Sequence, residues 1–478
     1  MLRRYVREEI LTMASRKDEL DMTEAPFIKK LIIFAIPVIL TGLLQCFYNA
    51  ADTAVVGSLR GEIALAAVGS TGALNGAIVN LFMGLSVGAG VVVARAIGAK
   101  NEKSVEKAIH SSVLLGLILG VIVGILGIIF ARPLLVLMDT PESVIGLSTL
   151  YMQINFTAMP ASLIYNYCAA IMRSNGNTKK PLYFLLISGA VNVLLNLLFV
   201  GAFGMSVDGV ALATVISQYL SAALILSYMA KSEGVLKFSF KKLCLDSSSI
   251  KNILAIGVPS GIQTTLFALS NVMIQSSVNS FGEITMAGNT AASNLESFIH
   301  TAMVSIYHAA LAFVGQNMGA KKYTNIKKIV FSCVLLSASI GVLVSALILI
   351  LRGPLLSLYT DNSEVVKWAV YRMLFMLPAY PFCGIMDATS ASLRAMGRSV
   401  NAMINALVGA CAFRIIWVKL IFNFVERDIG WIYLAFGISY VIGIILNVIF
   451  IINKYKNLTK SSDSSEAENA EETATQPA

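Results

Sequence analysis

Four ionisable side chains lie inside long apolar stretches of this 478-residue chain and are its strongest candidates for chemistry: Asp52, Glu296, Asp387 and Arg414. Placing an ionisable side chain inside a membrane helix costs about 2.5–3.5 kcal/mol on insertion scales. Such residues therefore usually bind ions, carry protons or form ion pairs. Each of the four needs either a partner or a function.

Asp52 ends a polar stripe on one helix face. Gln45, Asn49 and Asp52 are spaced i, i+4 and i+7, which places all three on the same side of an α-helix. We expect this face to look into a helical bundle and to form a polar site. The alternative is a carboxylate that caps the helix at the membrane boundary, because the helix rise carries Asp52 to about the outer edge.

The second half of the chain carries the other three groups. Glu296 and His300 are one helical turn apart near the middle of a long apolar stretch, where a carboxyl and an imidazole can exchange a proton. An ion pair between Glu296 and Arg414 explains the same residues equally well. Asp387 lies seven residues before Arg394, so it is either a functional acid or the partner of loop arginines.

These residues must be positioned by membrane helices, because the composition is that of a membrane protein. Hydrophobic residues make up 56% of the chain and charged residues only 13%. About twenty apolar residues cross a bilayer core of about 30 Å as a helix. We expect twelve spans, at 31–54, 62–93, 108–130, 146–171, 181–203, 207–230, 253–280, 284–314, 329–351, 365–392, 400–424 and 430–453.

The chain is a duplication. Five landmarks of the first half recur 221 residues later: Pro133, Pro160, Arg173, Gly176 and Gly209 return as Pro354, Pro381, Arg394, Gly397 and Gly430. Six crossings per half is an even number, so both halves enter the membrane from the same side, as parallel repeats do. The sequence therefore predicts an all-α polytopic membrane protein with twelve transmembrane helices in two six-helix lobes.

Charge and composition divide the chain further. Most of the 36 Lys and Arg residues fall in alternate loops, which predicts a multi-pass protein of the cell membrane with both termini in the cytoplasm. The tail is rich in Ser, Glu and Ala, a composition that predicts disorder. The expected segments are a cytoplasmic arm at 1–26, an N-lobe at 27–231, a cytoplasmic linker at 232–250, a C-lobe at 251–455 and a disordered tail at 456–478.

Several classes of function are not supported by the sequence. The net charge of +9 follows from the membrane topology, so basic segments are expected to contact anionic lipid and not nucleic acid. The six cysteines stand singly, without CxxC spacing. The chain has no GxxxxGK[ST], HExxH or DDxxD motif. We expect no enzyme activity, no cofactor, and no metal beyond a possible Na+ at Asp52.

Several short motifs, in register with the repeat, make the chain resemble the MATE (multidrug and toxic compound extrusion) transporters, in particular their bacterial DinF- and NorM-like branch. They are Tyr48-Asn49-Ala50-Ala51-Asp52-Thr53 before Gly57, Met172-Arg173-Ser174-Asn175-Gly176-Asn177, Leu393-Arg394-Ala395-Met396-Gly397, and Ala287-Gly288-Asn289-Thr290. The resemblance covers nearly the whole chain. It implies a secondary antiporter that exports organic, often cationic, compounds in exchange for Na+ or H+.

The resemblance also implies roles for single residues. Asp52 matches the helix 1 aspartate of the family, which implies that it binds the coupling cation with Asn49 nearby. The family often carries an Asn and, four residues later, an Asp on helix 5, where this chain has Asn192 and Asn196. With Thr214 these amides can ligate Na+ through oxygen, although one negative charge is missing. The alternative is plain interhelical hydrogen bonding.

A substrate cleft for flat lipophilic cations should be lined by aromatic, methionine and amide side chains. The candidates are Gln45, Phe47, Tyr48, Gln263, Phe267, Met273, Gln275 and Phe298. The expected mechanism is alternating access by two lobes, and the expected partners are membrane lipids and small organic substrates of a monomer. A flippase or an exporter of one lipid-linked or metabolite substrate is the alternative, and a non-transporting scaffold or receptor is a further one.

Overall fold

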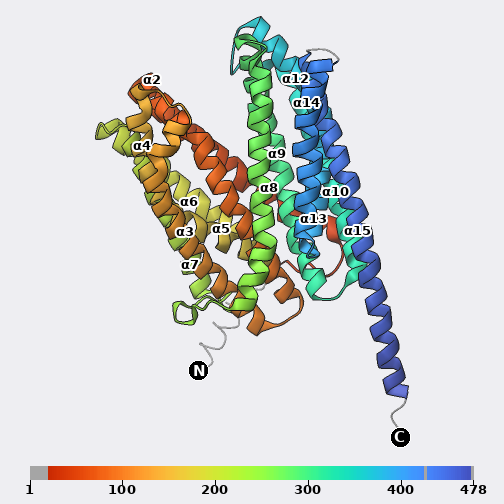
Figure 1. Cartoon of the computed structure of the whole chain (residues 1–478). Helices are drawn as coiled ribbons and strands as arrows, with labels where there is room; N and C mark the ends of the chain where they lie inside the picture. The colour runs from red at the N-terminus through yellow and green to blue at the C-terminus, as the bar shows by residue number, and fades with distance from the viewer. Residues whose placement is uncertain (1–19, 425–427, 475–478) are drawn as a thin grey trace. The chain divides into compact units, whose positions relative to one another are not determined.

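The computed structural model describes residues 20–424 and 428–474, and every regular element in these ranges is a helix (Figure 1). The described chain packs as two compact units. Unit 1 holds 20–22 with Lys29–Ala268, and unit 2 holds Thr23–Ile28 with 269–424 and 428–474. Most of the predicted arm at 1–26 lies outside the described residues, which begin at residue 20.

Unit 1 begins with a helix interrupted by a single kink. The helix α2 (Phe27–Gly98) contains two membrane-spanning segments, Phe27–Gly61 and Ile63–Gly98, which meet at Gly61 with φ of 77°. A residue without a Cβ adopts this left-handed conformation readily, so the chain turns there without a loop. The remaining helices of the unit are α3 (Glu102–Leu137), α4 (Glu142–Phe156), α5 (Met159–Ser174), α6 (Lys179–Asn196), the π-helix η1 (Leu197–Ala202) and α7 (Val207–Lys231).

Unit 2 holds the second set of helices. They are the later part of α8 (Ser247–Asn279), α9 (Glu283–Gly319), α10 (Tyr323–Ile350), α11 (Arg352–Leu356), α12 (Ser363–Ala395), α13 (Ser399–Ala406), the π-helix η3 (Leu407–Ala412), α14 (Phe413–Phe424) and α15 (Ile429–Ala474). Across the described residues, eleven helices are long and apolar enough to cross a membrane. The fourth predicted span, 146–171, is the pair α4 and α5, which completes the twelve crossings. Its break at 157–158 precedes Pro160, which suits a first helical turn.

The first half of α8 belongs to unit 1 because two glycines let helix backbones touch. A Cβ on Gly84 or on Gly261 would collide with backbone atoms of the facing helix. The Thr264 hydroxyl, one turn further along α8, donates to the Asn80 carbonyl at 3.1 Å. Close approach over small residues is a common way for membrane helices to associate. It anchors α8 against the second segment of α2.

The predicted linker at 232–250 is an ordered part of unit 1. Leu236 and Phe238 are buried in a hydrophobic cluster with Ile109 and Met229, and the short 3₁₀ helix η2 (Phe240–Lys242) follows. The Phe238 ring stacks on His110 with centroids 5.2 Å apart. The linker therefore packs on the start of α3.

The disordered tail at 456–478 stays a prediction. In the structure the helix α15 continues to Ala474, and the last four residues lie outside the described chain. The polar composition of this segment argues against a buried core, but Ala and Glu are strong helix formers, so they extend a helix that is already nucleated in the preceding apolar span.

Candidate functional site

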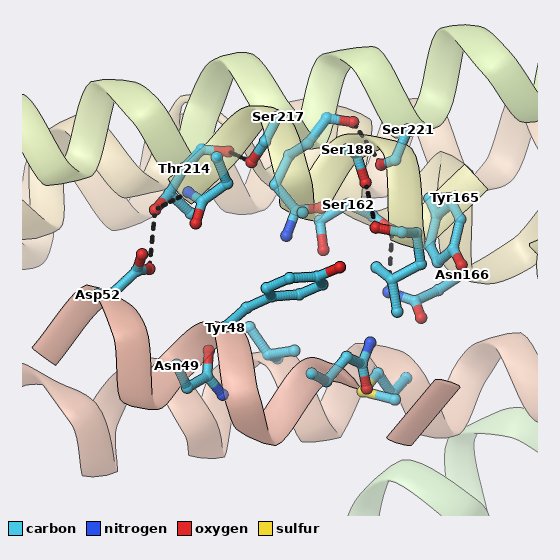
Figure 2. A pocket seen from close by; sticks show the side chains of 17 residues that line it. Tyr48, Asn49, Asp52, Ser162, Tyr165, Asn166, Ser188, Thr214, Ser217 and Ser221 are labelled. Carbon is cyan, nitrogen blue, oxygen red and sulfur yellow. Dashed lines mark hydrogen bonds between the residues drawn. The ribbon is translucent and has the colours of Figure 1, made fainter. Parts of the chain in front are cut away.

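Unit 1 contains a polar cavity of about 260 Å³ between its helices (Figure 2). It is bounded by both segments of α2 and by α5, α6 and α7. Its lining consists of Gln45, Tyr48, Asn49, Asp52, Val79, Met83, Ser162, Tyr165, Asn166, Leu185, Ser188, Gly189, Asn192, Thr214, Ser217, Gln218 and Ser221. Asp52 is the one charged side chain in this lining, and Figure 2 shows it at one end of the cavity with Asn166 and Tyr165 at the other.

The Asp52 carboxylate is held by two other helices. The side-chain amide of Asn196 in α6 donates to Asp52 Oδ1, and the Thr214 hydroxyl in α7 lies 3.3 Å from Asp52 Oδ2. The same hydroxyl lies 3.0 Å from the Val210 carbonyl, and its single hydrogen can serve only one of the two acceptors at a time. Asp52 thus lies in a small polar cluster at the junction of three helices.

Two asparagines complete the cluster. Asn192 and Asn196 are one turn apart in α6, and the Asn196 amide also lies 3.3 Å from Asn192 Oδ1. Asn192 Nδ2 is 3.5 Å from Thr214 Oγ1. Asn196 is fully buried, and its Oδ1 has no hydrogen-bond partner among the described residues. A buried acceptor without a partner, beside a carboxylate, is what a bound cation would satisfy.

The donor set decides which cations fit. One carboxylate with amide and hydroxyl oxygens is a hard-oxygen set that suits Na+ or a proton. Within the described ranges no three His, Cys, Asp or Glu side chains gather as ligands for a metal ion. The arrangement thus offers oxygen ligands to one small cation.

The structure places the polar stripe of α2 as its spacing predicts. Gln45, Asn49 and Asp52 all line the cavity, and so does Tyr48. Phe47 does not, because it points away and is 62% exposed. The Tyr48 ring lies over Gly189 of α6, where a Cβ would overlap the ring atoms, and its hydroxyl donates to the Leu186 carbonyl at 3.3 Å.

Sequence reasoning missed most of the remaining lining. The periodic signal was present, because Thr214, Ser217 and Ser221 follow i, i+3 and i+7 spacing in α7. Ser162 with Asn166 in α5 shows the same kind of signal at i, i+4. Serines are common inside membrane helices, where they bond to their own backbone, so the pattern does not stand out without the facing helices.

The other cleft candidates are not lining residues of this cavity. These are Gln263, Phe267, Met273 and Phe298. Gln275 of α8 accepts a hydrogen bond from the Asn289 side chain at 3.0 Å, and so takes part in a separate polar network of unit 2.

Glu296 forms a buried ion pair with Arg372 in unit 2. Arg372 Nε and Nη2 reach the two Glu296 oxygens at 3.0 and 2.6 Å, and the Tyr380 hydroxyl donates to Oε2 at 3.2 Å. The third arm of the guanidinium donates to Asn289 Oδ1 at 2.6 Å. Both carboxylate oxygens are thus occupied by Arg372 and Tyr380. His300 takes neither of them and is exposed.

An ion pair of Glu296 with Arg414 is therefore wrong, since the partner is Arg372. Arg414 instead donates to the Ser439 hydroxyl at 2.8 Å and lies 4.2 Å from the Phe436 ring centroid. Helix rise gives the depth of a residue in the membrane but not the direction in which its side chain points. Here α9 packs against α12, so Glu296 meets Arg372 of α12. Arg372 itself, which lies in the expected span 365–392, is inside α12 and is 9% exposed.

Asp387 is half-buried in α12 and makes no ion pair within residues 20–424 and 428–474. The two alternatives for Asp387, a functional acid or an arginine partner, are therefore not separated by its contacts.

Comparison with known proteins gives the family. The MatE family model matches residues 37–198 and 259–418, which together exceed half of the chain. The probable multidrug resistance protein YoeA of Bacillus subtilis (strain 168) is 27% identical over 425 residues, covering 87% of this chain and 92% of that protein. An FAD transporter of Shewanella oneidensis is 22% identical over 396 residues, covering 81% of this chain and 86% of its own length.

A solved structure shows the same fold. It is the outward-facing conformation of a multidrug resistance MATE family transporter of the MOP superfamily, with a TM-score of 0.86 at 19% identity. The match covers 92% of this chain and 99% of the other. With its duplicated six-helix lobes and its two family matches, this chain belongs to the MatE family of membrane transporters.

Proposed function

We propose that this protein is a secondary antiporter of the cell membrane that exports organic compounds in exchange for Na+ or H+. The observation that carries the proposal is the Asp52 cluster with Asn196 and Thr214, which forms one end of the polar cavity. A relative of similar length is named a probable multidrug resistance protein, which supports organic compounds as the cargo.

Substrate export is coupled to cation entry because both ligands compete for the single negative charge of Asp52. A cationic substrate in the cavity is attracted by the Asp52 carboxylate, and a Na+ or a proton bound there removes this attraction. By linkage, each ligand then lowers the affinity of the other by the same factor. Cation binding from the outside would thus release the substrate, and cation release inside would restore the site.

Alternating access would expose this site to each side of the membrane in turn. The first segment of α2 carries both Asp52 and Pro37, and Pro37 cannot donate a backbone hydrogen bond inside the helix. A helix bends most readily at such a position. We propose that bending there couples the occupancy of Asp52 to the opening of the cavity, with both chain termini in the cytoplasm.

The test is dye efflux from drug-sensitive bacterial cells. Ethidium export would be measured for wild type, Asp52→Asn and a control, Asp361→Asn, with Na+ and pH varied independently. Asp361 is exposed, so its variant makes the same chemical change outside the cavity. We expect Asp52→Asn to lose at least about tenfold of the activity and the control to keep it. Full activity of a folded Asp52→Asn protein refutes the coupling role.

Export of one dedicated metabolite is the second candidate, and the FAD transporter among the relatives favours it. Such a protein would move its metabolite and no dye under any gradient. Uptake of labelled flavin nucleotide into inverted vesicles, compared with ethidium in the same vesicles, separates the two candidates.

A further inference from the structure

Three serine hydroxyls of the unit 1 cavity already donate their hydrogens within their own helices. The hydroxyls of Ser188, Ser217 and Ser221 donate to carbonyls three residues earlier in their own helices, at 3.1, 2.8 and 2.8 Å. A serine hydroxyl has one hydrogen and two lone pairs. Once its hydrogen is donated to a carbonyl, the hydroxyl can only accept a hydrogen bond from a ligand. Figure 2 shows these serines on two neighbouring helices, opposite Tyr48.

The phenols of the cavity behave in the same way. Tyr165 donates to the Pro181 carbonyl at 2.9 Å and Tyr48 to the Leu186 carbonyl. The Asn166 amide donates one of its two hydrogens to the Ser162 carbonyl at 2.9 Å, and its oxygen is available as an acceptor. Asp52 accepts only, as an ionised carboxylate.

Some donors remain. The amides of Gln45, Asn49 and Gln218 and the hydroxyl of Ser162 line the cavity, and each can both donate and accept. No Lys or Arg is part of the lining, so these are its neutral donors. The Asp52 carboxylate and the serine hydroxyls that have donated their hydrogens add acceptors only. The lining as a whole is rich in acceptors and carries one negative charge.

We infer that this cavity selects organic cations that carry N–H donors, such as aromatic amines, primary or secondary ammonium groups and guanidinium groups. Cations of equal charge and similar shape whose amino groups are fully alkylated bind more weakly. They displace water from the acceptors without replacing its hydrogen bonds, and an unpaired buried acceptor is costly. The inference rests on the proposed export function and narrows its substrate class.

Tyr48 supplies the second part of the recognition. Its ring projects into the cavity from α2, and Gly189 provides the space that the ring occupies. An aromatic face beside acceptors and a carboxylate fits a flat cation that stacks on the ring and donates at its edge.

Proflavine and acridine orange form a matched pair of probes. They share the acridinium ring and its positive charge, but proflavine has two NH2 groups where acridine orange has two N(CH3)2 groups. Binding to the purified protein in detergent would be measured by fluorescence for both dyes. We expect wild type to prefer proflavine about tenfold, the effect of one or two hydrogen bonds to the lining.

Substitutions assign the preference to the cavity. Ser217→Ala with Ser221→Ala removes two acceptors and should reduce the proflavine preference to about threefold or less, chiefly by weakening proflavine. Ser188→Ala is a second, single variant should the double variant fold poorly. Ser260→Ala is the control, because that buried hydroxyl bonds to Ile256 in α8 and does not line the cavity. Lipid and detergent partition of each dye is the same for all variants, so changes in the ratio report on the protein.

The outcomes separate this inference from the proposed function. Equal binding of the two dyes by wild type, with efflux that still depends on Asp52, overturns the donor preference and leaves the antiporter standing. A preference that survives in every serine variant also overturns it. Failure of the folded protein to bind either dye, together with indifference of efflux to Asp52→Asn, refutes both.

Discussion

The side-chain amide of Asn196 donates to the carboxylate of Asp52, a residue 144 positions earlier in the chain. This bond joins α6 to the first segment of α2 and leaves Asn196 Oδ1 buried without a partner among the described residues. An amide thus occupies the place where a second carboxylate would double the negative charge. The site balances one acid against neutral groups, which makes it sensitive to small changes in charge.

Adding the second carboxylate should make the protein depend on Na+. In Asn196→Asp the amide donor is lost and two carboxylates face each other, so the protein without Na+ should melt several degrees lower. Added Na+ should restore most of this loss, because a cation between two carboxylates offsets their repulsion. The measurement is thermal unfolding of purified protein with and without Na+ at constant ionic strength, with choline as the replacement.

Asn196→Ala is the matched control for that experiment, since it removes the donor and adds no charge. It should lower the melting temperature without any rescue by Na+. Equal rescue of both variants would show that Na+ acts elsewhere.

Gly189 should tolerate no side chain while Tyr48 is present. In Gly189→Ala the new methyl group overlaps the Tyr48 ring, so α6 or the ring must move. Overpacking of this kind typically costs about 1–3 kcal/mol. We expect a lower melting temperature and reduced dye export. The double variant Gly189→Ala with Tyr48→Ala should regain the melting temperature but not the export, because the aromatic face is gone. A stable, active single variant would contradict the packing described here.

The Glu296 and Arg372 pair should matter for stability and not for coupling. Glu296→Gln leaves Arg372 as an uncompensated buried charge, which should cost about 3–5 kcal/mol. Replacing both residues, as Glu296→Gln with Arg372→Met, removes the charge and should recover most of that loss. The measurement is a double-mutant cycle of thermal unfolding, with exposed Glu283→Gln as the control.

The same variants decide whether Glu296 carries protons. If the pair is structural, the folded double variant keeps ion-coupled efflux of ethidium. Loss of coupling in a double variant of normal stability would instead assign Glu296 to the transport cycle.

The docked linker should loosen when Asp246 loses its charge. The Ser249 backbone N–H, the Lys107 ammonium 3.0 Å away and the Ser249 hydroxyl lower the pKa of Asp246 from 3.8 to about 2. A lowered pKa means that this stabilisation is complete above about pH 4 and is lost as the pH falls toward 2. Asp246→Asn should therefore speed trypsin cleavage at Lys241 and Lys242 near pH 8. With pepsin near pH 2, the variant and wild type should be cleaved at similar rates.

Glu233→Gln, in the same linker, serves as the control for that prediction because Glu233 is exposed and outside the docked contacts. Identical trypsin cleavage of Asp246→Asn and wild type would mean that the hydrophobic contacts of Phe238 alone hold the linker.

The sequence by itself determined the framework. Repeat spacing and hydropathy gave the duplicated, twelve-span architecture, because both depend only on residue order along the chain. The stripe of Gln45, Asn49 and Asp52 was also readable, since helical periodicity alone places residues on one face. The family motifs of α2 and α5 can also be recognised from the order of neighbouring residues alone.

Only the tertiary structure decided which faces meet. Depth estimates paired Glu296 with Arg414, whereas α9 turns this acid toward Arg372 of α12. The partner of Asp52 in α6, and the serines of α6 and α7 that line the same cavity, likewise depend on helix packing. A helical pattern specifies the direction of a side chain relative to its own helix axis. The neighbour in that direction is set by how glycines and bulky residues let the helices approach, as Gly189 and Tyr48 do here.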